Sequence, residues 1–326
     1  MVASSLLSGL PFQVTRLRTG EACALVRSVI DNHATRLVVA NTASMAALIP
    51  NGVTSPVVID THNVDSLVAT RYSATLQSPA QRIAALVNAR QFRRLERALS
   101  DRVSEWWTCS IDDARELDRV TGGVKVLTIP NGVDTTLFSD RGGGRRDGEV
   151  VFFGRLDYKP NADAVAWLLR DIWPRVRAAV PSASLRIIGA GNTSLLRPLF
   201  AGDRGAELVG FTPDVAGAVA RASACVVPLR MGGGTRLKIL EAFAAGTPVV
   251  TTRVGAEGID FADGVHAMVA DDAVGIADAL VVLLRDPGRR WSLARAARRL
   301  VEERYAWNSI EAVVAARAAA LIESTS

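Results

Sequence analysis

At 326 residues the chain is too long for one compact core, and its length predicts about two domains. Apolar residues make up 49% of it and charged residues 22%, a composition that is typical of globular proteins and excludes a largely disordered chain. The formal net charge of +5 indicates either ordinary surface arginine or an anionic partner, such as a phosphate ligand or an acidic membrane face. The sequence has no basic stripe with interleaved aromatic residues, which argues against a nucleic-acid partner.

The first part of the chain alternates strands and helices, the pattern of doubly wound α/β folds. Residues 21–32 predict a helix, and residues 80–100 predict an amphipathic helix with a row of arginines. Strands are expected at residues 36–40, 56–60, 105–109 and 125–129. A complete nucleotide-binding Rossmann half opens with a strand, a Gly-rich turn and a helix, which residues 1–37 do not provide. We therefore expect a first domain at residues 1–140 that lacks its beginning.

A Gly-rich, charged segment at residues 139–149 has no hydrophobic anchor and predicts an interdomain linker. A second α/β domain is expected at residues 148–306, with helices at 161–180 and 235–245. Its strands are expected at residues 149–153, 184–188, 207–209, 224–227 and 248–252. Residues 307–326 predict an amphipathic C-terminal helix, over 307–324, that packs back on the first domain.

The segment VVFFGRLDYKPN is a strand running into a turn, which places Arg155 and Lys159 just beyond its carboxyl end. Ligands of open α/β sheets bind at that edge. A guanidinium and an ammonium suit a diphosphate there, although two solvated loop cations would produce the same pattern.

The segment PLRMGGGTRLKILEAFAAGTPVV adds a second phosphate feature. Its glycines allow close backbone approach, and the helix that starts near Thr235 offers unpaired N–H groups and a positive dipole end to an anion. Glu241, further along this helix, can accept hydrogen bonds from two ribose hydroxyls. Lys238 can either reach the phosphates or pair with a nearby acid.

Two further loops follow strands at the same edge of the sheet. Gly189 and Gly191 permit close backbone approach to a ligand, and GFTPDV, with Asp214 and Val215, can offer backbone groups to a base. Plain turns would explain each loop equally well.

Taken in order, strand-GR-L…K, IIGAG, GFTPD and GGGTRLKILEAFAAGTPVV resemble the donor-binding domain of retaining glycosyltransferases with the GT-B fold (glycosyl transferases group 1, family 4). The resemblance covers residues 54–326 and implies two Rossmann-like α/β/α domains with the active site in the cleft between them. It implies donor-diphosphate contacts from side chains or backbone amides of Arg155, Lys159, Gly234, Thr235, Arg236 and Lys238, and a ribose contact from Glu241. It assigns the loops with Gly189, Gly191, Asp214 and Val215 to the nucleotide base.

In the first half, VVIDTHNVDS resembles the family segment whose histidine lies near the donor sugar and diphosphate, which makes His62 the catalytic candidate; a loop histidine bonded to its own backbone is the alternative. One departure concerns the two glutamates, separated by seven residues, that the family usually carries. The first, which contacts the donor sugar, is Gly233 here, so the contact falls to Arg236 or Lys238.

The resemblance implies transfer of a sugar from a nucleoside-diphosphate sugar to a sugar or lipid-linked acceptor hydroxyl, with retention, in cell-envelope or exopolysaccharide synthesis. No cofactor or metal is expected, because the three histidines are scattered. The cysteines Cys23, Cys109 and Cys225 are expected to be buried thiols in a reducing compartment, which favours the cytoplasm. No apolar run is long enough to span a membrane, so peripheral attachment to an anionic inner face, through the arginines of residues 90–102, is the membrane hypothesis.

Three alternatives remain at this level. A nucleotide-sugar-binding remnant without turnover follows if the missing front segment abolishes transfer. An NAD-dependent oxidoreductase would need a G-x-G-x-x-G turn after the first strand, which IIGAGN does not supply. A sugar-nucleotide epimerase shares the two-domain architecture, but LEAFAAGTPVV fits the transferases better.

Overall fold

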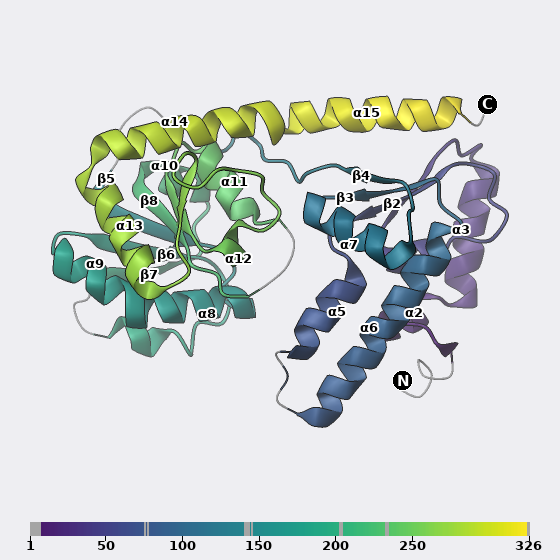
Figure 1. The fold of residues 1–326 in the computed structure, drawn as a ribbon, viewed down its shortest axis with the longest axis horizontal. Helices are drawn as coiled ribbons and strands as arrows, with labels where there is room; N and C mark the ends of the chain where they lie inside the picture. The colour runs from purple at the N-terminus through teal and green to yellow at the C-terminus, as the bar shows by residue number, and fades with distance from the viewer. Residues whose placement is uncertain are drawn as a thin grey trace. The chain divides into compact units, whose positions relative to one another are not determined.

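The computed structural model describes residues 8–74, 76, 78–139, 144, 146–201, 205–231 and 235–324. Its contacts divide the chain into two compact units (Figure 1). The first unit comprises Met1–Pro130 together with Glu311–Ser326, and the second comprises Asn131–Ile310. The division falls before residue 140, where the sequence-based domain boundary was placed.

The described residues of the first unit form a parallel sheet with the strand order β1-β2-β3-β4. Its strands are β1 (Val38–Asn41), β2 (Val57–Thr61), β3 (Glu105–Thr108) and β4 (Val126–Thr128). Its helices are α2 (Phe12–Leu17), α3 (Gly20–Asn32), α4 (Ala43–Ala46), α5 (Asp65–Ala74), α6 (Pro79–Ser100) and α7 (Ile111–Thr121). All four strands and both helices that the sequence predicted here are confirmed, with small shifts of their ends.

Successive side chains of a strand point to opposite faces of the sheet, so the core of the first unit is divided between the two faces. Ile59 and Trp106 face a cluster that includes Phe92 of α6, whereas Val58 and Trp107 face a smaller cluster. Helix α15 (Trp307–Glu323) completes that smaller cluster with Leu321, which is buried. The predicted C-terminal helix thus exists, and its last turns pack on the first unit.

The described residues of the second unit form a parallel sheet with the order β10-β9-β8-β5-β6-β7. Its strands are β5 (Arg146–Phe153), β6 (Ser184–Ile188), β7 (Ala206–Gly210), β8 (Ala222–Val227), β9 (Val249–Thr251) and β10 (Ala267–Val269). Helices flank this sheet (Figure 1). They are α8 (Lys159–Trp167), α9 (Trp173–Ala179), α10 (Val215–Arg221), α11 (Leu237–Ala244), α12 (Arg253–Ala256), α13 (Ala273–Arg285) and α14 (Pro287–Arg304). A π-helical turn (Leu168–Ile172) joins α8 to α9, and a 3₁₀ helix (Arg197–Phe200) precedes β7.

Two parallel sheets with flanking helices confirm the predicted α/β class. One boundary was wrong: the linker does not extend to residue 149, because β5 already begins at Arg146. The Arg146 guanidinium pairs with Glu149, 3.1 Å from Nη1 to Oε2, and the Arg146 carbonyl accepts a hydrogen bond from Ser223 of β8 at 3.1 Å. Residues 140–143 and 145 of the predicted linker lie outside the described residues.

Strand β5 is the first strand of the second unit and lies in the interior of its sheet, between β8 and β6. The chain leaves β5 towards β6 on one side and returns to β8 on the other, so strand order reverses at this point. Parallel sheets open a crevice at the carboxyl ends of the strands at such a reversal. The fold thereby marks the ends of β5 and β8 as a binding position.

Candidate functional site

A pocket of about 310 Å³ lies at the carboxyl ends of β5 and β8. It is lined by Phe153, Gly154, Tyr158, Pro160 and Asn161 from the β5–α8 segment, by Leu229 and Met231 after β8, and by Thr235, Arg236, Leu237, Lys238 and Glu241 at the start of α11. The pocket therefore brings together residues of the two segments in which the sequence analysis predicted phosphate contacts, although Arg155 and Lys159 are not among its lining residues.

Lys238 lies in the first turn of α11 and brings its ammonium into this pocket. Its Nζ donates a hydrogen bond of 2.7 Å to Asn161 Oδ1 and lies 4.4 Å from the centroid of the Phe152 ring. Loss of hydration lowers the pKa of Lys238 to about 8, an effect that neighbouring Arg236 adds to and that Cys225 and Glu241 oppose. Lys238 is thus a cation whose surroundings only partly compensate its charge.

Arg236 and Thr235 line the pocket just before α11. Only 8% of Arg236 is exposed, and its Nη2 donates to the carbonyl of Val254 at 3.4 Å. The Thr235 hydroxyl is buried and makes no hydrogen bond within the described part of the chain. The helix begins at Leu237, two residues later than predicted, so both residues precede its first turn.

Glu241 follows Lys238 by about one helical turn and lines the same pocket. Burial raises the pKa of Glu241, and the nearby Lys238 lowers it by less. Two cations and one carboxyl group therefore share this pocket. Because a buried net charge is costly, such a set favours an anionic ligand.

Arg155 and Lys159 belong to the same β5–α8 segment but do not line the pocket. Both are exposed, and Arg155 forms a bidentate ion pair with Asp157, with distances of 3.1 Å from Nε to Oδ1 and 2.6 Å from Nη2 to Oδ2. The two predicted diphosphate cations thus flank the residues that do line the pocket.

Gly189 and Gly191 pack against the turn after β5. A Cβ on Gly189 would collide with the carbonyl oxygen of Gly154, and one on Gly191 would lie 2.6 Å from the backbone nitrogen of Asp157. The Leu156 N–H donates to the Ala190 carbonyl at 2.8 Å across the same contact. Close packing of two loops accounts for both glycines, and neither lines the pocket.

The remaining predicted residues are dispersed. Asp214 caps α10 by accepting a hydrogen bond of 2.8 Å from the Gly217 N–H, and Val215 packs against the core. Gly234 lies outside the described residues. His62 follows β2 in the first unit, where its side chain is exposed and its carbonyl accepts a hydrogen bond of 2.9 Å from the Cys109 thiol.

Among the lining residues with polar side chains, sequence reasoning missed Tyr158 and Asn161. The KPN that ends the β5 motif was the available signal. A Pro is common at the start of a helix, so this segment predicts that a helix begins beside Tyr158 and Asn161. Asn161 is only 6% exposed, which is unusual for a polar residue.

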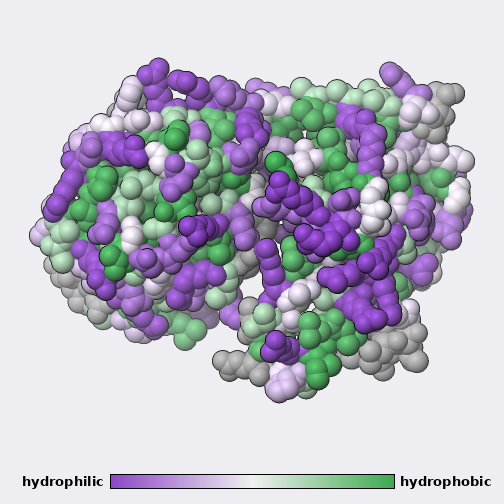
Figure 2. All heavy atoms as spheres, viewed as in Figure 1, coloured by the Kyte–Doolittle hydropathy of each residue, from purple (hydrophilic) through white to green (hydrophobic). Residues whose placement is uncertain are grey.

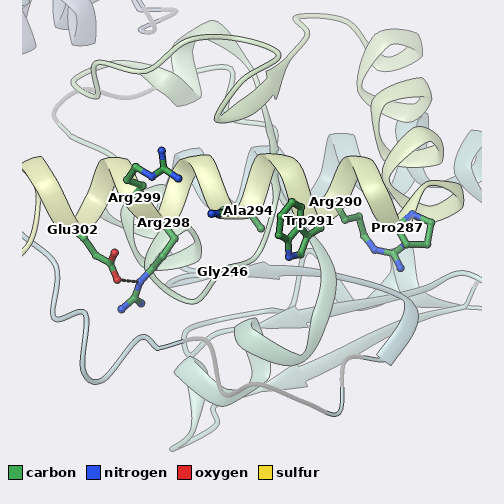
Figure 3. A pocket seen from close by; sticks show the side chains of 9 residues that line it. Gly246, Pro287, Arg290, Trp291, Ala294, Arg298, Arg299 and Glu302 are labelled. Carbon is green, nitrogen blue, oxygen red and sulfur yellow. Dashed lines mark hydrogen bonds and ion pairs between the residues drawn. The ribbon is translucent and has the colours of Figure 1, made fainter.

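A larger pocket of about 530 Å³ runs along α14 and is rich in arginine (Figure 3). Two of its four arginines, Arg290 and Arg298, are already held by groups of the fold. Arg298 donates to the Phe138 carbonyl at 2.9 Å and pairs with Glu302 at 2.6 Å, and Arg290 donates to the Leu283 carbonyl at 2.8 Å. Although it is larger, this pocket lies along α14 and not at the carboxyl ends of the strands, where ligands of open α/β sheets bind.

The described residues contain no cluster of three or more His, Cys, Asp or Glu side chains suited to a metal ion. Among the cysteines, Cys109 and Cys225 are buried as expected, whereas Cys23 is only partly buried. Within the same part of the chain, no helix has the length and apolar character that crossing a bilayer requires.

Two parallel-sheet units of this kind are the GT-B glycosyltransferase fold. The structure of HepE from Anabaena in complex with UDP and glucose matches with a TM-score of 0.67 and 18% identity, over 91% of this chain and 82% of that one. Sucrose-phosphate synthase from Thermosynechococcus elongatus matches with a TM-score of 0.70 and 20% identity, over 92% and 78%.

Within the second unit, residues 147–286 match the family model described as glycosyl transferases group 1. Over 214 residues the chain is 35% identical to phosphatidyl-myo-inositol mannosyltransferase of Mycolicibacterium smegmatis, covering 62% of this chain and 54% of that protein. The chain thus spans about half the length of the curated relatives that it matches.

Proposed function

We propose that the chain transfers a sugar from a nucleoside-diphosphate sugar to an acceptor hydroxyl, with retention at the anomeric carbon. The observation that carries this proposal is the pocket at the end of β5, which Arg236 and Lys238 line with a single carboxyl group, that of Glu241, among the described lining residues. A diphosphate supplies the negative charge that this set favours.

The same residues suit the chemistry of bond cleavage. As the glycosidic bond to the donor breaks, negative charge gathers on the leaving diphosphate. Preorganised cations from Arg236 and Lys238, with the Thr235 hydroxyl, would stabilise that charge, which is why we expect the reaction to need no metal. Glu241 would accept hydrogen bonds from the ribose hydroxyls.

Further predicted contacts complete the proposal. Arg155, Lys159 and the backbone at Gly234 are proposed diphosphate contacts, for which Arg155 would have to exchange Asp157 for the ligand. His62 is the proposed donor contact from the first unit. We propose that the loops that contain Gly189 and Asp214 contact the nucleotide base of the donor.

Donor and acceptor are proposed from the relatives. One is a complex with UDP and glucose, a second is named as a phosphatidyl-myo-inositol mannosyltransferase, and a third is named as GDP-mannose-dependent. UDP- and GDP-hexoses are therefore the donors to test, and a sugar or lipid-linked hydroxyl is the acceptor class. A role in cell-envelope glycan synthesis in the cytoplasm follows as part of the proposal.

Transfer is tested by incubating the protein with UDP- or GDP-hexoses and candidate acceptors, and by determining the anomeric configuration of the product by NMR. We expect a product that retains the donor configuration. A product of inverted configuration would contradict retention, and nucleotide binding without any product would favour a binding protein that lacks turnover.

The membrane partner is proposed from the first unit. Tyr72 of α5 and Ile83 of α6 are 58% and 63% exposed, and Figure 2 shows hydrophobic surface at the end of this helix pair. Arg93 and Arg94 lie exposed further along α6. Apolar side chains beside cations suit the surface of an anionic bilayer. We expect the protein to sediment with anionic vesicles and not with neutral ones; equal sedimentation with both would contradict this partner.

A further inference from the structure

Asn161 connects the two halves of the donor pocket. It lies in the first turn of α8, and its side chain makes two hydrogen bonds in opposite directions. Its Nδ2 donates to the Arg155 carbonyl at 2.8 Å, and its Oδ1 accepts from Lys238 Nζ at 2.7 Å. A Cβ on Gly154 would lie 3.0 Å from Asn161 Nδ2 and 2.9 Å from Lys238 Nζ, so the glycine provides the room for this contact.

The partner of the Lys238 ammonium differs chemically from the partners of the neighbouring cations. Two other cations near this segment are neutralised by carboxylates, Arg155 by Asp157 and Arg230 by Asp163, the latter at 2.6 Å and 3.0 Å. Lys238 instead meets a neutral amide. An amide oxygen fixes the direction of an ammonium group but carries no net charge with which to cancel it.

We propose that Asn161 is a positioning residue that aims the Lys238 ammonium at the donor diphosphate while leaving its charge available to the ligand. This assignment rests on the proposed function, because it requires that the pocket bind a nucleoside diphosphate. It gives Asn161 a role that depends on its neutrality as well as on its shape.

Replacing Asn161 with aspartate separates the effect of its neutral charge from the effect of its shape. Asn161→Asp keeps the size of the side chain but places a negative charge beside Lys238, so the diphosphate must compete with an internal ion pair. Its carboxylate also faces the Arg155 carbonyl, a contact that Asn161→Ala avoids. We expect Asn161→Asp to weaken binding of UDP or GDP at least tenfold, and Asn161→Ala to weaken it less. A residue that acted only by filling space would show the reverse order, because aspartate is nearly isosteric with asparagine.

The experiment is isothermal titration of UDP and GDP into the full chain, its Asn161→Asp, Asn161→Ala and Lys238→Met variants, and the Asn161→Asp/Lys238→Met double variant. Thermal melts establish that each variant is folded. We expect the effect of Asn161→Asp to vanish in the Lys238→Met background, because the cation that it neutralises is then absent.

Two results would overturn the assignment while leaving the proposed function intact: an Asn161→Asp variant that binds as tightly as the wild type, or an equal loss with and without Lys238. Failure of the wild-type chain to bind either nucleotide would instead refute the proposed function, and the role of Asn161 with it.

Discussion

Lys238 holds its charge where charge is costly. Among the described residues, an amide oxygen and an aromatic ring lie within hydrogen-bonding or ring-contact distance of its ammonium. Burial lowers the pKa of this ammonium to about 8. Structural lysines are usually solvated or paired with a carboxylate. A partly compensated lysine in a pocket at the end of a sheet is better explained by a ligand that completes its environment.

The first prediction concerns the pH dependence of nucleotide binding. Lys238 is protonated below about pH 8 and loses its proton above it, and a diphosphate binds the protonated form. We expect the affinity for UDP or GDP, measured by titration calorimetry, to fall by about tenfold per pH unit above pH 8. In Lys238→Met this fall should disappear. A wild-type affinity that is constant between pH 7 and 9 would show that Lys238 does not contact the ligand.

The second prediction concerns Glu241. Glu241→Ala should weaken UDP binding by ~1–3 kcal/mol, because hydrogen bonds from ribose to a charged acceptor are lost. A deoxyribose form of the nucleotide provides the control, since it should bind the wild type more weakly but the variant about equally. If both proteins lose the same affinity on removal of the hydroxyl groups, Glu241 is not the ribose contact.

At the scale of elements, the turn after β5 is built by packing against the loop after β6. Gly189 allows the two backbones to approach so closely that any side chain would strike the Gly154 carbonyl. This contact fixes the turn that leads into α8, where Tyr158 and Asn161 line the pocket.

The third prediction follows from that contact. Gly189→Ala should destabilise the second unit by about 1–3 kcal/mol and weaken nucleotide binding, because the turn must move to accommodate a methyl group. Urea denaturation measures the first effect. Gly20→Ala, at a helical position with open space around it, is the matched control and should be nearly neutral. Equal stability of both variants would show that the two loops are not held together as described.

The fourth prediction concerns Glu96 of α6, which is almost fully buried and accepts a hydrogen bond from the Ser66 N–H at 3.0 Å. Burial raises the pKa of Glu96 from 4.5 to about 7. The folded state therefore binds a proton that the unfolded state releases, so stability falls as pH rises from about 4.5 to 7. Glu96→Gln should raise stability at pH 8 by on the order of 2 kcal/mol and leave it nearly unchanged at pH 4. Thermal melts at both pH values measure this, and an equal effect at each would contradict it.

Most of the strands and helices could be predicted from the sequence, because the spacing of apolar residues and the turn residues are local signals. The sequence indicated the strands that flank the pocket and the helix that carries Lys238. It misjudged Arg146, whose polar surroundings resemble a linker, because its place in β5 depends on Ser223, 77 positions away. Asn161 was missed for the same reason, since its partner Lys238 is also 77 positions away.

At the scale of the whole chain, the C-terminal helix returns to the first unit and buries a charge there. The Glu105 side chain, which is fully buried, accepts hydrogen bonds from Arg317 of α15 at 2.8 and 2.9 Å and from Trp107 at 2.7 Å. Burial acts to raise the pKa of Glu105, but these bonds together outweigh it and the pKa is lowered. The stability of the first unit thus depends on residues from the C-terminal helix.

The fifth prediction tests that dependence. Arg317→Ala leaves Glu105 buried without its guanidinium and should destabilise the first unit by about 2 kcal/mol, somewhat below the usual loss for a broken buried pair because Arg317 is a quarter exposed. Hydrogen exchange of β3 measures the change. Glu311→Ala, at an exposed position of the same helix, should leave exchange unaltered. Unchanged protection in Arg317→Ala would mean that α15 does not stabilise the sheet.

The proposed function requires that the pocket at the end of β5 recognise two phosphates rather than one. Titration calorimetry with UDP beside UMP, and GDP beside GMP, tests this most directly. We predict that the wild type binds the favoured diphosphate at least tenfold more tightly than its monophosphate, and that Lys238→Met removes most of the difference. Equal affinity for monophosphate and diphosphate, or a preference that survives the loss of Lys238, would contradict it.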